Sequence, residues 1–260
     1  MRITLIGSGN VATHLGAALR NAAHHIVQVY SRHAQNAALL AYHVRAEPIS
    51  DLSQISAETD LFIISINDDA IGAMAEQLAV HRKLMVHTSG ATPLTHLLAF
   101  TDLAGVFYPL QTFSKSKEVD FRSVPLCIEG ADEQIVKDLR ELAQTISNNV
   151  ALVSSEQRKV LHLSAVFSCN FPNYLYYTAQ QLLAQHQLDF NLLRPLIAET
   201  AQKVQERFPA DVQTGPAIRH DEKTMLSHMA MLQPDEDLRR LYGLLSQAII
   251  KMGKDKQGVK

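Results

Sequence analysis

Cysteine is scarce in this sequence, because its 260 residues include only Cys127 and Cys169. Two cysteines this far apart cannot form a disulfide framework, and no spacing of cysteine and histidine indicates a zinc site. We therefore expect no metal. We interpret both cysteines as buried free thiols of a protein from a reducing compartment.

Long runs of one kind of residue are missing as well. The formal net charge is only −2, and the sequence lacks the basic stripe that a nucleic-acid partner requires. No apolar run approaches the roughly 20 residues of a membrane span. Met1-Arg2 leads directly into a short strand and not into a signal peptide. These absences predict a soluble, cytoplasmic protein without nucleic-acid or membrane partners.

The first half of the chain alternates short β-rich runs with helical patterns. Leu61 to Ile66 is a nearly continuous apolar run, as expected of a parallel strand that is covered on both faces. The order strand, helix, strand predicts right-handed crossovers and an open α/β sheet, doubly wound and mainly parallel, of the Rossmann type. Strands are expected over 3–6, 26–30, 61–66, 84–86, 106–108, 125–129 and 151–153, and helices over 11–23, 35–42, 69–80, 93–99 and 131–148.

From Ser155 onward the sequence changes character. Helical patterns cover 156–185, 190–208, 221–232 and 235–251, and no strand-like alternation occurs. The sequence thus predicts a Rossmann domain over 1–154 and an all-helical domain over 155–260. Pro172 lacks a backbone N–H and is expected to bend the first of these helices.

A glycine-rich turn follows the first expected strand and opens the first expected helix. Its residues are Gly7-Ser8-Gly9-Asn10-Val11-Ala12. In such a G-x-G-x-x-A pattern, Gly7 permits the tight turn, Gly9 lets backbone N–H groups approach a pyrophosphate, and Ala12 lets the helix pack closely on the strand. The helix N-terminus then faces the phosphates. We predict a dinucleotide site at residues 7–12, with a purely structural turn as the alternative.

The end of the second expected strand distinguishes between cofactors. Enzymes that use NAD usually place Asp or Glu there, which accepts a hydrogen bond from the ribose 2′-hydroxyl. Tyr30-Ser31-Arg32-His33 contains no acid. Arg32 can stack on adenine and pair with a 2′-phosphate, to which Ser31 can donate a hydrogen bond. The predicted cofactor is therefore NADP(H), unless Arg32 is simply a solvated loop residue.

Polar turns follow the later strands at the same edge of the expected sheet, and they converge on one crevice. Asp68 and Asp69 are interpreted as caps of the following helix, because carboxylates favour helix N-termini. Tyr108 either donates to a substrate oxygen or is an aromatic filler. Further candidate contacts to the cofactor are Ser65, Asn67, His87 and Ser89.

Several motifs are spread over almost the whole chain. They are the glycine turn with Asn10, the turn at 87–90, Tyr108–Phe113, His162 with Asn170-Phe171, and the stretch 214–219. Together they resemble a family of Rossmann-like NADP oxidoreductases with a helical domain of unknown function. More distantly, the layout is similar to pyrroline-5-carboxylate reductase, prephenate dehydrogenase and the β-hydroxyacid dehydrogenases.

That resemblance implies a helical domain of the 6-phosphogluconate-dehydrogenase C-terminal type and hydride transfer in a cleft between the domains. It also implies a homodimer formed through the helical half, which a monomer on sizing chromatography would contradict. The resemblance does not identify a substrate.

A polar stripe on the long helix supplies the candidate catalytic residues. At ~100° per residue, Lys159, His162, Asn170 and Asn173 fall within roughly a quarter of the helix circumference. The β-hydroxyacid dehydrogenases carry a catalytic lysine and an asparagine one turn apart, but the position one turn after Lys159 is Leu163. His162 is therefore the predicted general acid, because imidazole titrates near working pH.

Asn170 and Asn173 are predicted to hold the substrate or the carboxamide. Alternatively, His162 and these asparagines satisfy buried backbone groups at a helix–helix interface. Arg219 is either a clamp for an anionic substrate or part of a helix start that Asp221 caps.

Two kinds of function follow from these residues. The first is an NADP(H)-dependent oxidoreductase that acts on a small carbonyl, imine or hydroxy acid, with a deazaflavin-dependent NADP reductase as a variant. The second is a non-catalytic NADP(H)-binding sensor or scaffold.

Overall fold

The computed structural model describes residues 1–258, and the side chains of residues 1–255. These residues form two compact units, Met1–Tyr174 and a second unit that starts at Leu175. The expected boundary near residue 154 coincides with the start of helix α6 (Ser155–Ala165), which belongs to the first unit by its contacts. As a domain boundary, position 154 stays a prediction.

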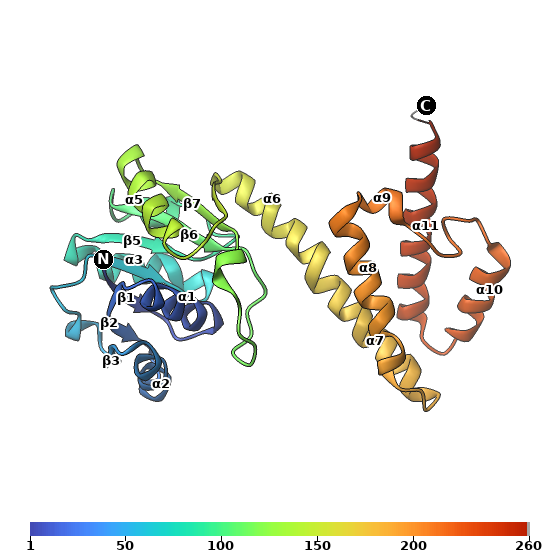
Figure 1. Cartoon of the computed structure of the whole chain (residues 1–260), viewed down its shortest axis with the longest axis horizontal. Coiled ribbons are helices and arrows are strands. Elements are labelled where there is room, and N and C mark those ends of the chain that lie inside the picture. Colours follow the sequence, from blue (N-terminus) through green and yellow to red (C-terminus); the bar gives the residue numbers. More distant parts are fainter. Residues whose placement is uncertain (259–260) are drawn as a thin grey trace. The chain divides into compact units, whose positions relative to one another are not determined.

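The first unit is built on an eight-stranded sheet in the order β3-β2-β1-β4-β5-β6-β7-β8. Figure 1 shows this sheet with helices packed around it. The strand order reverses between β1 and β4, which opens the crevice where α/β sheets of this type bind ligands. The predicted doubly wound, mainly parallel sheet is confirmed. The strands are β1 (Arg2–Ile6), β2 (His25–Tyr30), β3 (Glu47–Ile49), β4 (Leu61–Ile64), β5 (Leu84–His87), β6 (Ala104–Pro109), β7 (Leu126–Gly130) and β8 (Val150–Leu152). The sequence did not predict β3, whose few residues include Pro48.

Helices cover both faces of this sheet. Leu5 of β1 packs with Leu15 and Leu40, whereas its neighbour Ile6 packs with Ile71 and Leu97 on the other face. Successive side chains of a strand point to opposite faces, so the central strands are apolar along their whole length. Helices α1 (Asn10–Asn21), α2 (Ala34–Val44) and α5 (Glu133–Gln144) share the face of Leu5, and α3 (Ile71–Leu78) and α4 (Thr95–Leu98) share the face of Ile6.

One connection departs from the predicted crossover pattern. Strands β6 and β7 are antiparallel, so no crossover helix is needed and the chain returns through residues 110–125. Within this loop, Asp120 caps a single 3-10 turn, Phe121–Ser123. The loop leaves β6 at the edge of the sheet where β1, β4 and β5 also end, and this brings it against the glycine turn.

The predicted helix over 156–185 is present, but it is not regular throughout. A π-helical segment, Val166–Asn170, separates α6 from α7 (Phe171–Gln185). Pro172, at which the sequence predicted a bend, is the second residue of α7, just after this segment. The expectation that both cysteines are buried is wrong for Cys169. That residue lies in the π-segment, whose neighbours Phe167 and Phe171 are exposed as well, so the segment is not part of a core.

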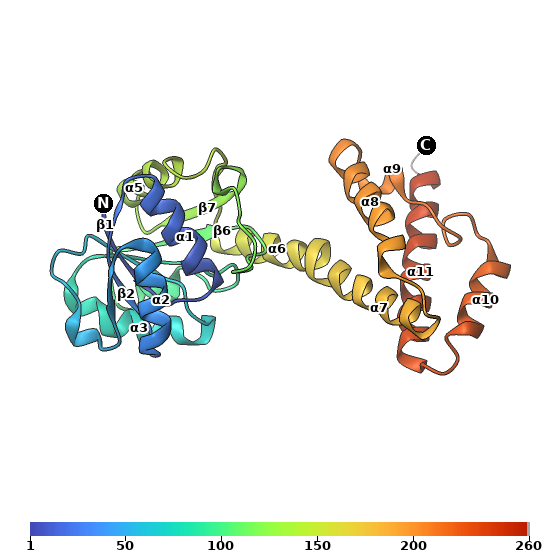
Figure 2. The same ribbon diagram turned by 60° about the horizontal axis from the view of Figure 1, so that its bottom comes forward.

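The second unit consists of helices and loops in the residues that the structure describes (Figure 2). Besides the end of α7, its helices are α8 (Arg194–Glu206), α9 (Pro209–Val212), α10 (Glu222–Met231) and α11 (Glu236–Gly258), of which α9 was not predicted and α11 continues beyond the predicted end at 251. No helix within residues 1–258 is long and apolar enough to cross a membrane. The homodimer stays a prediction. It would bury much of residues 161–177, where Leu163 and Tyr177 are exposed apolar side chains.

Candidate functional site

A cavity of about 710 Å³ lies at the carboxyl ends of the central strands, entirely within the first unit. Its volume is within the usual range for small-molecule and cofactor sites. The cavity brings together most of the residues that the sequence proposed from distant positions. These are Gly7, Ser8, Gly9, Asn10, Val11, Ser31, Arg32, Ser65, Asn67, Ser89, Tyr108 and His162.

The glycine turn has the geometry that a dinucleotide needs. Gly7 has a φ of +117°, and a Cβ built on it would lie 2.2 Å from the carbonyl oxygen of Ser65. Only glycine fits here, because the turn passes so close to the end of β4. A Cβ at Gly9 would meet nothing within 4 Å, so a pyrophosphate has open access to the backbone. Ala12 is fully buried between α1 and the sheet.

The end of β2 presents hydroxyl and guanidinium groups to the same cavity. The Ser8 hydroxyl donates to the Ser31 hydroxyl oxygen at 3.1 Å, which links the glycine turn to the end of β2. Arg32 is exposed and lines the cavity. The two residues that the sequence proposed for a 2′-phosphate, Ser31 and Arg32, therefore both line this cavity.

The turns after β4 and β5 are bonded to each other. Thr88 Oγ1 donates to Ser65 Oγ at 3.1 Å, and Ser89 Oγ donates to Asp68 Oδ2 at 2.8 Å. Asp68 and Asp69 lie in the first turn of the 3-10 helix Asp68–Ala70, where the sequence predicted carboxylates, but no side chain caps this helix, and the Asp68 carboxylate accepts from Ser89 across the turn instead. Ser89 Oγ also accepts from the N–H groups of Ala91 and Thr92. The Ser89 hydroxyl therefore uses its donor and its acceptor capacity within the turn and stabilises it.

His87 does not reach the cavity. Its side chain is fully buried, and its Nδ1 accepts from the N–H of Ser89 at 3.2 Å. Burial, together with the nearby Arg158, lowers the pKa of His87 to about 3, so the ring is neutral at physiological pH. The predicted contact between His87 and the cofactor finds no support in this geometry, because His87 does not line the cavity. We infer that the ring stabilises the turn by accepting the hydrogen bond from the N–H of Ser89.

Tyr108 and His162 form a pair on the cavity wall. The Tyr108 hydroxyl lies 3.2 Å from His162 Nδ1, so helix α6 and strand β6 meet at this point. Burial raises the pKa of Tyr108, which keeps the phenol protonated in neutral solution. Gly90 makes the pair possible: a Cβ there would lie 2.7 Å from His162 Nδ1 and 2.8 Å from Tyr108 Cζ.

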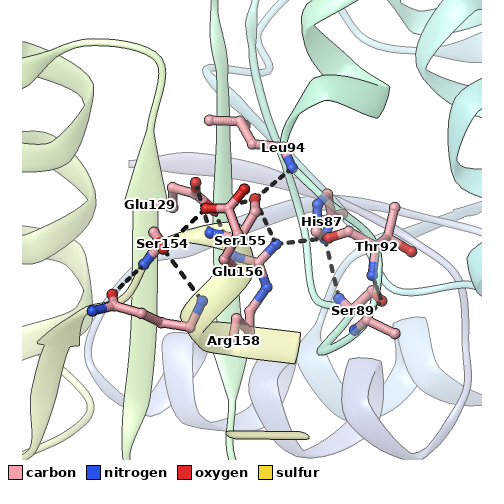
Figure 3. A network of polar contacts seen from close by, with 11 residues as sticks. His87, Ser89, Thr92, Leu94, Glu129, Ser154, Ser155, Glu156 and Arg158 are labelled. Atoms are coloured by element: carbon pink, nitrogen blue, oxygen red, sulfur yellow. Dashed lines mark hydrogen bonds and ion pairs between the residues drawn. The ribbon is translucent and has the colours of Figure 1, made fainter. Parts of the chain in front are cut away.

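A buried ion pair fixes the first turn of α6 beside this pair (Figure 3). The Arg158 side chain is 1% exposed and donates to Glu129 Oε2 at 2.5 Å and to the Thr92 carbonyl at 2.7 Å. Ser155 joins the network, because its hydroxyl donates to Glu129 Oε2 at 2.8 Å and accepts from the N–H of Leu94 at 3.0 Å. The network ties α6 to β7 and to the turn that contains Gly90.

Some predicted site residues are not brought into the cavity. Asn170 and Asn173 are exposed and do not line it. Arg219 lies in the second unit, on the loop before α10. There Asp221 caps α10 by accepting from the N–H of Thr224 at 3.1 Å, as one interpretation of this loop proposed. Residues 1–258 contain no cluster of ligands that could hold a metal ion.

Nothing in the sequence indicates the roles of Gly90 and Arg158. Gly90 belongs to a polar turn, but its missing side chain is what admits Tyr108 and His162. Arg158 has no local signal, because an arginine in a helix is normally solvated. Its burial depends on Glu129, which comes from a different element.

Two family models match the sequence: a Rossmann-like domain over residues 1–111 and a domain of unknown function, DUF2520, over residues 124–249. Among solved structures, the putative NADP oxidoreductase BF3122 from Bacteroides fragilis is 44% identical, with a TM-score of 0.89 over 96% of this chain and 98% of that chain. The chain belongs to this Rossmann-like/DUF2520 family.

More distant structures share the fold of the family. Protein TM1727 from Thermotoga maritima is 19% identical, with a TM-score of 0.83 over 97% of this chain and 99% of that chain. An imine reductase from Myxococcus stipitatus, solved in complex with NADP+, is 15% identical, with a TM-score of 0.66 over 100% of this chain and 95% of that chain. A comparison with curated proteins gave no significant match.

Proposed function

We propose that this protein is an NADP(H)-dependent oxidoreductase that transfers a hydride to or from a small carbonyl, imine or hydroxy acid. The observation that carries the proposal is the Tyr108–His162 pair, which lines the same cavity as the glycine turn. A dinucleotide site alone fits a sensor equally well, whereas a paired phenol and imidazole on its wall can also move a proton.

A nicotinamide dinucleotide fits the residues of the cavity. Gly9 leaves open space for its phosphates, the N-terminus of α1 offers free N–H groups, and Ser31 with Arg32 suits a 2′-phosphate. When bound, the nicotinamide supplies or accepts the hydride, and the protein contributes positioning and a proton. The name of BF3122 and the NADP+ complex of the imine reductase support the choice of cofactor and reaction class.

Reduction of a carbonyl or imine requires a proton at oxygen or nitrogen, and the pair can deliver it. When the Tyr108 hydroxyl donates to His162 Nδ1, the ring proton that can reach the substrate is on Nε2. His162 gives that proton to the substrate and receives the phenolic proton at Nδ1. Solvent then returns a proton to Nε2, and Nδ1 returns its proton to the Tyr108 oxygen, which restores the starting state. Oxidation of a hydroxy acid or amine runs through the same positions in reverse.

Turnover by the pure protein tests this proposal. We expect NADPH oxidation in the presence of at least one ketoacid, aldehyde or cyclic imine, measured by the loss of nicotinamide absorbance. Turnover restricted to deazaflavins would replace the proposal with a deazaflavin-dependent reductase, which needs no proton donor in the cavity. Tight NADPH binding without turnover on the whole panel would favour a sensor or scaffold.

The preference for NADP(H) over NAD(H) is assigned to Arg32. Replacing Arg32 by glutamate puts a carboxylate where a 2′-phosphate would lie and offers an acceptor for a 2′-hydroxyl. We expect Arg32→Glu to weaken NADPH binding by about tenfold or more, because hydrogen bonds to charged groups contribute about 1.5–3 kcal/mol. NADH binding should be unchanged or tighter, as measured by calorimetry. An unchanged ratio of the two dissociation constants would refute the assignment.

A further inference from the structure

The glycine turn has no cationic side chain of its own. Residues 7–13 are uncharged, and α1 has no Lys or Arg before Arg20. Arg32 is the one Lys or Arg among the residues that line the cavity. If Arg32 serves the 2′-phosphate, a pyrophosphate at the turn meets only backbone N–H groups and the dipole of α1.

The loop between β6 and β7 brings a lysine to this turn from outside the cavity wall. Lys115 Nζ donates to the carbonyl oxygen of Ser8 at 3.0 Å. A carbonyl is neutral, and it occupies only one of the three N–H donors of an ammonium group. None of the carboxylates that the structure describes forms an ion pair with Lys115. The charge of this lysine is therefore uncompensated beside the phosphate-binding turn.

The backbone that leads to Lys115 is held against α1 and is not a freely moving surface loop. The Asn10 amide donates to the Phe113 carbonyl at 2.9 Å, and His14 Nε2 donates to the Ser114 carbonyl at 2.9 Å. The Phe113 ring stacks on His14 and on Phe121, with centroids 5.2 and 5.9 Å away. These contacts fix the residues just before Lys115 on the first turns of the helix.

We propose that Lys115 binds the cofactor. Its ammonium group moves from the Ser8 carbonyl to an oxygen of the pyrophosphate and pairs with it. The inference rests on the proposed function, because a dinucleotide must occupy the turn. An ammonium group gains more from an anionic oxygen than from a neutral one, and its present acceptor belongs to the turn that receives the phosphates. The Asn10 side chain anchors the loop, and the contact of Asn10 with the cofactor stays a prediction.

Calorimetric titration of wild type and variants with NADPH and with NADH tests this assignment. Both dinucleotides carry the pyrophosphate, and only NADPH carries a 2′-phosphate. We expect Lys115→Met to raise the Kd of both by the same factor, about tenfold, because a charge-assisted hydrogen bond to the pyrophosphate is lost; tenfold corresponds to about 1.4 kcal/mol. The dependence of Kd on ionic strength should weaken as well, because one screened charge contact is lost.

The matched control is Lys117→Met, which removes the same charge from the same loop. It should leave both dissociation constants unchanged, and Arg32→Glu should weaken NADPH alone. An unchanged Kd in Lys115→Met, an effect on NADPH only, or an equal effect of Lys117→Met would each overturn the assignment. Wild-type protein that binds neither dinucleotide would instead refute the proposed function, and the assignment with it.

Discussion

Replacing Arg158 by methionine is expected to lower the free energy of unfolding by about 3–5 kcal/mol, the usual cost of removing one partner of a buried ion pair. The substitution preserves much of the side-chain volume. However, it leaves the mostly buried Glu129 carboxylate without its cation and the Thr92 carbonyl without its donor. Chemical denaturation followed by circular dichroism measures the loss, since the chain has no tryptophan to report on unfolding.

Two further variants separate this explanation from a simple packing defect. Adding Glu129→Gln to Arg158→Met removes the uncompensated charge, so the double variant should be more stable than Arg158→Met alone. Arg2→Met breaks the exposed pair between Arg2 and Asp60 in the same unit and should cost much less, because water screens that pair. If the double variant loses as much as the two single variants added together, the residues do not act as a pair.

Local patterns in the sequence were sufficient for the fold class and for the glycine turn that we propose holds the phosphates. Gly7, Gly9 and Ala12 lie close together in sequence, and each role is local: the backbone of the turn requires Gly7, Gly9 leaves open space beside the turn, and Ala12 lets α1 pack on the sheet. The apolar runs of the central strands are equally local, because both faces of a parallel sheet are covered. Predictions of this kind need no knowledge of which distant segments meet.

Properties that depend on distant contacts could not be predicted in the same way. Tyr108 and His162 were both candidates, but nothing in the sequence indicated that they touch each other. His87 resembled a site residue because it ends a strand, yet its ring is buried and does not line the cavity. Lys115 and Arg158 were not candidates, since the first depends on an antiparallel return that was expected to be parallel, and the second on a carboxylate in another strand.

The largest expected effect on activity comes from the Tyr108–His162 pair. Loss of a general acid typically costs about 10²–10⁴-fold in rate. We therefore expect Tyr108→Phe and His162→Gln each to lower kcat by about that factor on any substrate found for the wild type. The Kd for NADPH should change little. The double variant should be hardly slower than either single variant, because residues that act as a unit are not additive.

Glycine substitutions test the geometry of the pair without removing either group. Gly90→Ala places a methyl group 2.7 Å from His162 Nδ1 and 2.8 Å from Tyr108 Cζ, so it must push the two side chains apart. Gly72→Ala in α3 is the control, because its Cβ meets nothing within 4 Å. Gly90→Ala should lower kcat almost as much as the removal of Tyr108 or His162, and Gly72→Ala should not. If Tyr108→Phe and His162→Gln keep kcat and lower only the melting temperature, the pair holds α6 against β6 and carries no proton.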